Sequence, residues 1–190
     1  MRSGKPRTEP APDPRAAPAA SFPPQVGARC RVLVLGSVPS PRSLALRQSY
    51  GHAQNLFWPF MGELFAAGPD LPYAQRIARL HARGVGIWDV LERCRRHGAL
   101  DSRIVRTSEV ANDIGGLLAV HAEVAAIALN GGKALEVFGR RIVAQIDPAR
   151  MARLQILALP STSPANASMP RALKLERWRA LLDWADPPPH

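Results

Sequence analysis

Cysteine is scarce in this chain, and long apolar runs are missing. Only Cys30 and Cys94 occur among the 190 residues, which argues against a disulfide framework and excludes a zinc or iron–sulfur site built from four cysteines. No apolar run approaches the roughly 20 residues that a membrane span requires. The five histidines are scattered, without the i,i+4 pairing of a metal-binding helix. We therefore expect no metal, no cofactor and no membrane contact, and a cytoplasmic protein of a bacterial-type cell.

Acidic residues are also in short supply. The chain has 25 Lys and Arg against 15 Asp and Glu, a formal net charge of +10. Such a charge favours a polyanionic partner, because Lys and Arg that neutralise phosphates release condensed counterions. Solubility alone, or an Arg- and Ala-rich proteome, would explain the same excess. Charge by itself therefore leaves nucleic acid as one of two open interpretations.

Large apolar side chains are almost absent from the first 28 residues, which are rich in Pro, Ala and Arg. Such a segment cannot bury enough surface to offset its ordering entropy, so we predict a disordered tail over residues 1–28. Residues 29–186 then form one domain of a common size, about 150 to 160 residues, with one core and one site. Residues 187–190 form a short C-terminal tail. We expect the protein to act as a monomer.

Short apolar runs alternate with helical patterns along the rest of the chain. The runs at 31–36, 85–90, 124–129 and 154–159 predict four buried strands. Helical spacing predicts helices over 57–67, 72–82, 132–146 and 171–184, with Asn112 as the N-cap of another, and the basic stretch around Cys94 is also expected to be helical. Strands that are apolar throughout imply a parallel sheet covered on both faces. The predicted fold class is α/β, a three-layer α/β/α sandwich around a mostly parallel four-stranded sheet.

The loops after the predicted strands carry the unusual chemistry. In such sheets ligands bind beyond the carboxyl ends of the strands. Two of these loops, at 36–41 and 160–167, are rich in hydroxyls and stiffened by proline, so their backbone could approach a phosphodiester closely and donate N–H groups to it. Ordinary Pro/Ser turns are the alternative interpretation. The candidate contacts to a DNA backbone are Ser37, Pro39, Ser40, Ser161, Thr162, Ser163, Pro164 and Asn166, with added charge from Arg171 and Lys174.

Four sequence blocks carry a resemblance to a known family. They are G-S-V-P-S-P-R-S-L from Gly36, N-L-F-W-P from Asn55, G-I-W-D-V-L-E-R-C from Gly86 and S-T-S-P-A-N from Ser161. Together they resemble the hypoxanthine-DNA (deoxyinosine) glycosylases of the uracil-DNA glycosylase superfamily, over about residues 32–184. The resemblance implies a uracil-DNA glycosylase-like fold. It also implies a monofunctional, metal-free enzyme of base excision repair that hydrolyses the N-glycosidic bond of deaminated bases, chiefly hypoxanthine, in double- or single-stranded DNA.

The resemblance also implies roles for single residues. Asn55 would carry the catalytic amide. Val38 stands where many members have a water-activating Asp or Asn, and Ser161 stands where the closing motif often begins with a histidine. Both departures argue against strong uracil excision. Asp89 matches a position from which relatives contact the base edge, although an N-cap of a following helix is the alternative.

The chemistry of the reaction supports this choice of residues. Breaking the bond develops positive charge on the sugar and negative charge on the base, so the site needs a held water and hydrogen-bond donors. The amide of Asn55 could donate to the C6 carbonyl of hypoxanthine and accept from its N1–H, whereas adenine presents the opposite pattern. The base must also leave the duplex to be reached. We expect Val38 to line its pocket, Phe57 to form a stacking floor, and Trp58 to belong to the core.

Other functions remain as alternatives. They are a uracil- or xanthine-preferring glycosylase of the same superfamily, a catalytically silent lesion-binding module, and a small-molecule enzyme such as a nucleoside hydrolase. Asn55 favours the enzyme over the silent module. The run Gly131-Gly132-Lys133 lacks the spacing of a phosphate-binding loop. Neither of the two hydroxyl-rich loops contains a lysine, which argues against Schiff-base chemistry.

Overall fold

The main sheet of the computed structural model, which describes residues 16–187, is the predicted parallel one. Its strands are β2 (Val32–Gly36), β3 (Val85–Asp89), β6 (Ala126–Asn130) and β7 (Gln155–Leu159), in the order β3-β2-β6-β7. All three neighbouring pairs are parallel. The fold class is therefore confirmed as a three-layer α/β/α sandwich.

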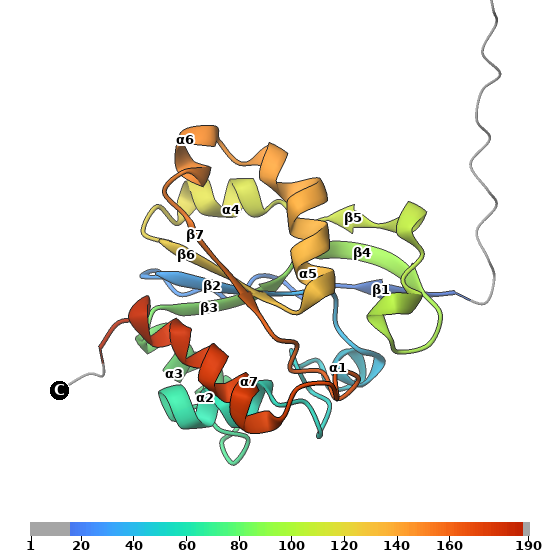
Figure 1. Ribbon diagram of the computed structural model, residues 1–190, viewed down its shortest axis with the longest axis horizontal. Coiled ribbons are helices and arrows are strands. Elements are labelled where there is room, and N and C mark those ends of the chain that lie inside the picture. Colours follow the sequence, from blue (N-terminus) through green and yellow to red (C-terminus); the bar gives the residue numbers. More distant parts are fainter. Residues whose placement is uncertain (1–15, 188–190) are drawn as a thin grey trace, which may run out of the picture.

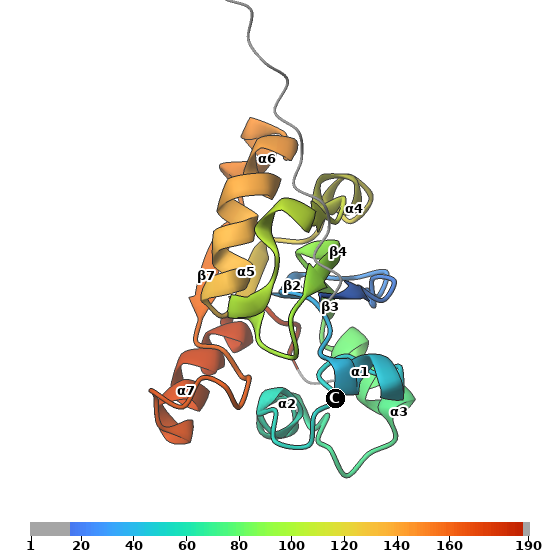
Figure 2. The ribbon, with the colours of Figure 1, turned by 90° about the vertical axis from the view of Figure 1, so that its right-hand side faces the viewer.

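Helices cover both faces of this sheet (Figures 1 and 2). One face carries α4 (Ile114–Val120), α5 (Gly132–Val137) and α6 (Pro148–Met151), and the other carries α2 (Phe57–Phe65), α3 (Tyr73–Ala82) and α7 (Arg171–Trp178). Alternate residues of β2 point to opposite faces, so that Leu33 and Leu35 join one core cluster and Val32 and Val34 join the other. A strand buried on both faces reads as one continuous apolar run, which is why the sequence revealed it.

A second, antiparallel sheet was not predicted. It consists of β1 (Ala17–Ala20), β4 (Leu91–Arg96) and β5 (Val110–Ala111), in the order β1-β4-β5. The expectation of a helix around Cys94 is therefore wrong. β4 follows β3 almost directly, and 3₁₀ turns η1 (Asp101–Arg103) and η2 (Arg106–Ser108) lie between β4 and β5.

The predicted disordered tail is wrong for residues 16–28. All four residues of β1 pair with β4, from Ala17 opposite Arg96 to Ala20 opposite Arg93, and the backbone of Gln25 exchanges hydrogen bonds with Ile87. Composition indicated disorder because this segment has few large apolar side chains, yet a strand that joins an existing edge is held by its backbone hydrogen bonds. Residues 1–15 and 188–190, where the predicted tails continue, lie outside the described residues.

Several helix boundaries also differ from prediction. The helix expected over 132–146 is split into α5, a π-helical turn at Phe138–Ile142 and a 3₁₀ turn at Val143–Gln145, while α7 continues as the 3₁₀ turn Arg179–Asp183. A short helix α1 (Pro41–Leu46) was not expected. The N-cap of α4 is Asp113, which accepts from the Gly116 N–H over 2.8 Å, and not Asn112. Asn112 is instead buried, and its side-chain amide donates to the Asp89 carbonyl over 2.8 Å.

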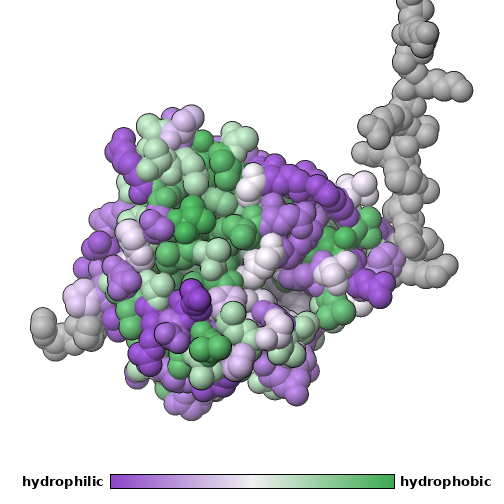
Figure 3. All heavy atoms as spheres, viewed as in Figure 1, coloured by the Kyte–Doolittle hydropathy of each residue, from purple (hydrophilic) through white to green (hydrophobic). Residues whose placement is uncertain are grey.

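The surface differs between the two sheets. Figure 3 shows hydrophobic side chains gathered around β7, the edge strand of the parallel sheet, and hydrophilic ones on the side where the small sheet lies. Within residues 16–187, none of the helices is long and apolar enough to cross a membrane.

Candidate active site

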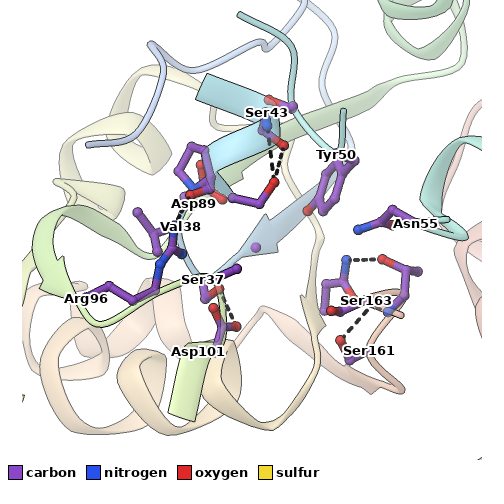
Figure 4. A pocket seen from close by; sticks show the side chains of 17 residues that line it. Ser37, Val38, Ser43, Tyr50, Asn55, Asp89, Arg96, Asp101, Ser161 and Ser163 are labelled. Carbon is purple, nitrogen blue, oxygen red and sulfur yellow. Dashed lines mark hydrogen bonds between the residues drawn. The ribbon is translucent and has the colours of Figure 1, made fainter. Parts of the chain in front are cut away.

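The carboxyl ends of the four parallel strands open onto one cavity (Figure 4). The loops after β2 and β7 line it, as predicted, together with the segment that precedes α2. The structure thus brings together residues from positions 36 to 163 of the chain. Of the predicted site residues, those that line the cavity are Ser37, Val38, Pro39, Ser40, Asn55, Asp89, Ser161, Thr162 and Ser163.

Gly36, the last residue of β2, makes room for the floor of this cavity. A Cβ placed on it would lie 2.6 Å from Asp89 Oδ1 and 3.0 Å from the Tyr50 hydroxyl oxygen. Any side chain here would therefore push these two groups apart. The absence of a side chain lets a carboxyl and a phenol approach the same point.

Asp89 contributes a buried carboxyl group at the end of β3, with 9% of the residue exposed. Burial raises the pKa of Asp89 to about 7, and the nearby negative charge of Asp101 acts in the same direction. Among residues 16–187, no ion pair offsets these effects at Asp89. Because β4 follows it, and not a helix, the alternative of an N-cap is wrong. With a pKa near neutrality, Asp89 holds its proton in mildly acidic solution and is divided between its neutral and ionised forms in neutral solution.

Tyr50, and not Phe57, presents an aromatic ring to the cavity. The two rings are stacked, with centroids 3.8 Å apart and planes 20° apart. Phe57 is fully buried behind Tyr50 in the core and does not line the cavity, which corrects its predicted place as the floor. Tyr50 has a φ of 56°, an unfavourable value for a residue with a large side chain. Trp58 is a core residue, as expected, and its indole N–H donates to the Ser49 carbonyl over 2.9 Å.

Asn55 lies just before α2 and is held by a local turn. Its Oδ1 accepts from the Phe57 N–H over 2.9 Å, a side-chain-to-backbone bond typical of Asn at such positions. The adjacent Leu56 N–H donates to the Thr162 carbonyl over 3.0 Å, which ties this turn to the loop after β7. Since the oxygen of the Asn55 amide is engaged, the amide N–H groups remain for the cavity. Figure 4 shows Asn55 on the side of the cavity where Tyr50 lies.

The loop after β7 is fastened from beneath. Thr162 is fully buried; its N–H donates to Asn130 Oδ1 and its hydroxyl accepts from Asn130 Nδ2, both over 2.9 Å. Lys174 is buried as well, and its ammonium donates to the Ser161 carbonyl over 2.9 Å and to that of Asn166. Thr162 and Lys174 therefore support the loop from inside the protein and do not face outward as a phosphate contact would require. This corrects their expected placement.

The other residues predicted to contact a DNA backbone fall into two groups, those that line the cavity and those that do not. Ser161 and Ser163 line the cavity, whereas Pro164 and Asn166 do not. Asn166 donates to the Ser161 carbonyl over 3.4 Å and so stabilises its own loop. Arg171, expected to add charge, is paired with Glu63 on the surface. Ser40 caps α1 by accepting from the Ser43 N–H over 3.1 Å.

The Gly131-Gly132-Lys133 run has a structural explanation. Gly131 has a φ of 94°, and a Cβ on it would come within 2.7 Å of Ser161 Cβ. A glycine is therefore required where α5 begins beside the loop after β7. Lys133 points to Glu109, with Nζ and Oε1 2.7 Å apart, and is not directed at a phosphate site.

Four of the cavity residues that sequence reasoning missed carry polar side chains of interest: Tyr50, Arg96, Asp101 and Asn130. Asn130 could have been found, since it ends a buried strand of the parallel sheet, and Tyr50 stands five residues before Asn55 without a distinguishing pattern. Arg96 and Asp101 belong to β4 and η1, and no rule about parallel sheets directs attention to them. Residues 16–187 contain no group of three or more His, Cys, Asp or Glu side chains placed to hold a metal ion.

Fold and site together define a protein of the uracil-DNA glycosylase class: a parallel sheet whose strand ends carry a G-S-x-P loop, an amide, a buried acid and a closing S-T-S-P loop. The family model of the uracil DNA glycosylase superfamily matches residues 23–182. The chain belongs to this superfamily.

Individual relatives agree. The chain is similar to a hypoxanthine DNA glycosylase of Methanosarcina acetivorans, 31% identical over 162 residues, which cover 84% of this chain and 95% of that protein. It is 36% identical over 86 residues to a hypoxanthine DNA glycosylase of Methanosarcina barkeri, covering 44% of this chain and 53% of that one. A solution NMR structure from Methanosarcina acetivorans, described as a candidate uracil DNA glycosylase, superposes with a TM-score of 0.71 at 28% identity, over 87% of this chain and 96% of that one.

Proposed function

We propose that this protein is a monofunctional DNA glycosylase that hydrolyses the N-glycosidic bond of deaminated bases, with hypoxanthine as its chief substrate. The observation that carries the proposal is the meeting of Asn55 and Asp89 in one cavity at the strand ends. The similarity to two proteins named hypoxanthine DNA glycosylase supports it.

A protonated Asp89 suits the hydrogen-bonding edge of hypoxanthine. A neutral carboxyl group offers one O–H donor and one carbonyl acceptor, and hypoxanthine offers the C6 carbonyl and the N1–H. Adenine presents the opposite pattern, an amino group at C6 and an unprotonated N1, and pairs in the same position only with the proton on the other carboxyl oxygen. Where the surrounding contacts fix that proton, buried polar groups left unpaired cost about 1 to 3 kcal/mol each. The raised pKa of Asp89 supports this role, because an ionised carboxylate could only accept.

Asn55 would act on the departing base. Its N–H groups can donate to the base as negative charge develops there, because its oxygen is already bound to the Phe57 N–H. Donors fixed in advance stabilise such charge more effectively than water, which must reorient. The hydrogen bonds around Asn55 supply this fixation. The ring of Tyr50, stacked on Phe57, offers a face to a flipped base.

Binding to DNA would use the rim of the cavity. The net charge of +10 favours phosphates, and Arg42 and Arg47 are exposed at either end of α1, which begins directly after the cavity residue Ser40. These two arginines are better placed than Arg171 and Lys174, which are engaged within the protein. Ser161 and Ser163 supply neutral donors on the opposite loop. The base would have to be extruded from the duplex to enter.

Excision assays test the proposal. The purified protein is incubated in EDTA with duplexes that contain one inosine, uracil or xanthine, and abasic sites are then cleaved with alkali. We expect the inosine strand to break only after alkali. Asn55→Ala should lower the single-turnover rate about 10²- to 10³-fold, while Gln155→Ala, which removes an exposed amide on β7, should leave it unchanged.

The other outcomes select the alternatives. Preferred cleavage of the uracil or xanthine strand would make that base the chief substrate in place of hypoxanthine. The protein would still be a DNA glycosylase. Tight, salt-sensitive binding without cleavage of any duplex would contradict the enzyme and favour a silent lesion-binding module.

A further inference from the structure

Asp101 brings a second carboxyl group into the cavity from outside the parallel sheet. It begins η1, beyond β4, and lies 64 positions from Ser37 along the chain. The Ser37 hydroxyl nevertheless donates to Asp101 Oδ2 over 2.6 Å. In Figure 4, Asp101 and Asn55 approach the cavity from opposite sides, with Ser37 beside Asp101. The cavity thus contains an amide on one side and a carboxylate on the other.

The loop that carries Asp101 is held in place by Arg96. This guanidinium is buried, and it donates to the Gly98 carbonyl over 3.1 Å and to the Pro39 carbonyl over 3.0 Å. It therefore joins the loop after β4 to the loop after β2. Because these bonds already fasten the two loops, the carboxylate of Asp101 is not needed for that purpose. A partly buried acid beside a ligand cavity is instead typical of functional groups.

Burial raises the pKa of both Asp101 and Asp89, but their other surroundings differ. At Asp101 burial outweighs the hydrogen bond from Ser37 and the positive charges of Arg96 and Lys133, which act to lower the pKa. Asp89 has no such compensation, and the charge of Asp101 raises its pKa further. Of the two carboxyl groups, only Asp101 has a hydrogen bond and positive charges that favour its ionised form, as a base requires. The titratable groups that face Asp101 are Asp89 of β3, Cys94 and Arg96 of β4, Lys133 of α5 and Tyr50.

The proposed reaction needs a proton acceptor, which neither Val38 nor Asn55 supplies, and Asp89 is used in its protonated form to hold the base. Hydrolysis consumes one water, which must be oriented and must lose a proton. Val38, directly after Gly36-Ser37, has no lone pair to offer. The Asn55 oxygen accepts from Phe57, and an amide does not hold a proton at neutral pH. Asp101 has one oxygen on Ser37, which leaves Oδ1 to accept from water.

Resting on the proposed glycosylase function, we propose that Asp101 is the general base of the reaction. The water oxygen forms a bond to C1′ of the deoxyinosine as the C1′–N9 bond breaks. The electron pair of that bond leaves with the purine, and the water proton passes to Asp101 Oδ1. The purine leaves as an anion held by donors from Asn55 and Asp89 and takes a proton from solvent. The proton on Asp101 then returns to solvent, so that atoms and charge balance.

Asp101→Asn tests the assignment. The amide keeps an acceptor for the Ser37 hydroxyl but cannot take up a proton. We expect the single-turnover rate on an inosine duplex to fall about 10²- to 10³-fold, with duplex affinity within about threefold because phosphate contacts dominate it. Asp183→Asn is the matched control, since it removes the same charge from an exposed position in η5, and it should leave the rate unchanged.

Ser37→Ala gives an independent readout of the same carboxylate. Losing the hydroxyl removes a hydrogen bond that favours the ionised form of Asp101, so the acid limb of the rate against pH should move to higher pH. A purely structural role for Asp101 would not move this limb. This test also holds if Asp101→Asn fails to fold.

The results separate the two proposals. A wild-type protein that excises hypoxanthine, with Asp101→Asn equally fast or with an unmoved acid limb in Ser37→Ala, would overturn the role of Asp101 and leave the glycosylase intact. A wild-type protein that excises none of the deaminated bases would overturn both.

Discussion

The parallel sheet and the antiparallel sheet serve the same cavity by different means. The parallel sheet delivers Gly36, Asp89 and Asn130 simply because its strands end at one edge. The antiparallel sheet lies to one side, and it delivers Asp101 through a loop that Arg96 fastens with hydrogen bonds. One contribution follows from topology, and the other depends on particular side chains. The cavity therefore combines residues placed by the parallel sheet with a residue placed by the hydrogen-bonded loop after β4.

A buried cluster of ion pairs, which we call the clamp, holds the small sheet in place; it consists of Glu109, Lys133 and Arg140. Glu109, just before β5, has a fully buried side chain that binds Lys133 of α5 over 2.7 Å and also binds Arg140 in the π-helical turn. Arg141 lies 3.4 Å from the same carboxylate. Burial acts to raise the pKa of Glu109, but hydrogen bonds from Lys133 and Arg140 outweigh it, and the pKa lies below its ordinary value. This carboxylate thus joins the small sheet to the helices that cover the large one.

Apart from the Asn55 and Asp101 variants, the largest effect is expected in the parallel sheet, from Gly36→Ala. The added methyl would meet Asp89 Oδ1 at 2.6 Å and the Tyr50 hydroxyl at 3.0 Å. Shifts of this size in an active site reduce rates about 10²-fold, and overpacking costs about 1 to 3 kcal/mol of stability. Single-turnover excision and urea unfolding measure the two effects.

Gly139→Ala is the matched control for this change, since nothing lies within 4 Å of the Cβ it would add. Full activity in Gly36→Ala would mean that the strand ends tolerate more movement than the contacts at Gly36 imply.

A smaller effect, on stability, is expected at the clamp. Glu109→Gln leaves Lys133 and Arg140 without their buried partner and should lower the free energy of unfolding by about 3 kcal/mol. Glu136→Gln touches the same two cations from a side chain that is 46% exposed, and should lower it by less than about 1 kcal/mol. Urea unfolding at pH 7 compares the two variants.

The pH dependence of the Glu109 effect has a definite sign. Because the pKa of Glu109 is lowered on folding, its contribution is present above the ordinary value of 4.5 and is lost as the pH falls below it. The difference between wild type and Glu109→Gln should therefore shrink in acid. If Glu109→Gln lowered the free energy of unfolding at pH 7 no more than Glu136→Gln does, the buried position of Glu109 would add no stability.

The last expected effect is the pH dependence of the excision rate, which we assign to Asp89 at the junction of the two sheets. Its pKa of about 7 means that the neutral form, which can donate to hypoxanthine, is lost as the pH rises through that value. Above it, the excision rate should fall about tenfold per pH unit. Asp89→Asn keeps a donor and an acceptor at every pH, so its rate should lack this alkaline limb. An alkaline limb that persists in Asp89→Asn would assign the limb to another group.

The two sheets also differ in how well the sequence foretold them. Every strand of the parallel sheet was predicted because each is an apolar run, and in β2, β3 and β6 these residues are buried on both faces. β4 was missed because a register shift between Leu91 and Arg93 breaks its alternation, so that Leu91 and Cys94 stand three apart, as on a helix. β1 was missed because Ala and Pro give it no apolar pattern at all. The cavity residues follow this division only in part: Asp89 was foreseen and Asp101 was not, but Asn130 of the parallel sheet was missed as well.

The sequence by itself determined the layers of this protein, the edge of the sheet where ligands bind, and the family to which its blocks point, because apolar periodicity and short motifs are local properties of the chain. Only the tertiary structure decided which polar groups meet. It placed Tyr50 in front of Phe57, Lys174 beneath the loop after β7, and Asp101 against Ser37. These encounters depend on hydrogen bonds and close contacts between segments far apart in the chain, which no local pattern records.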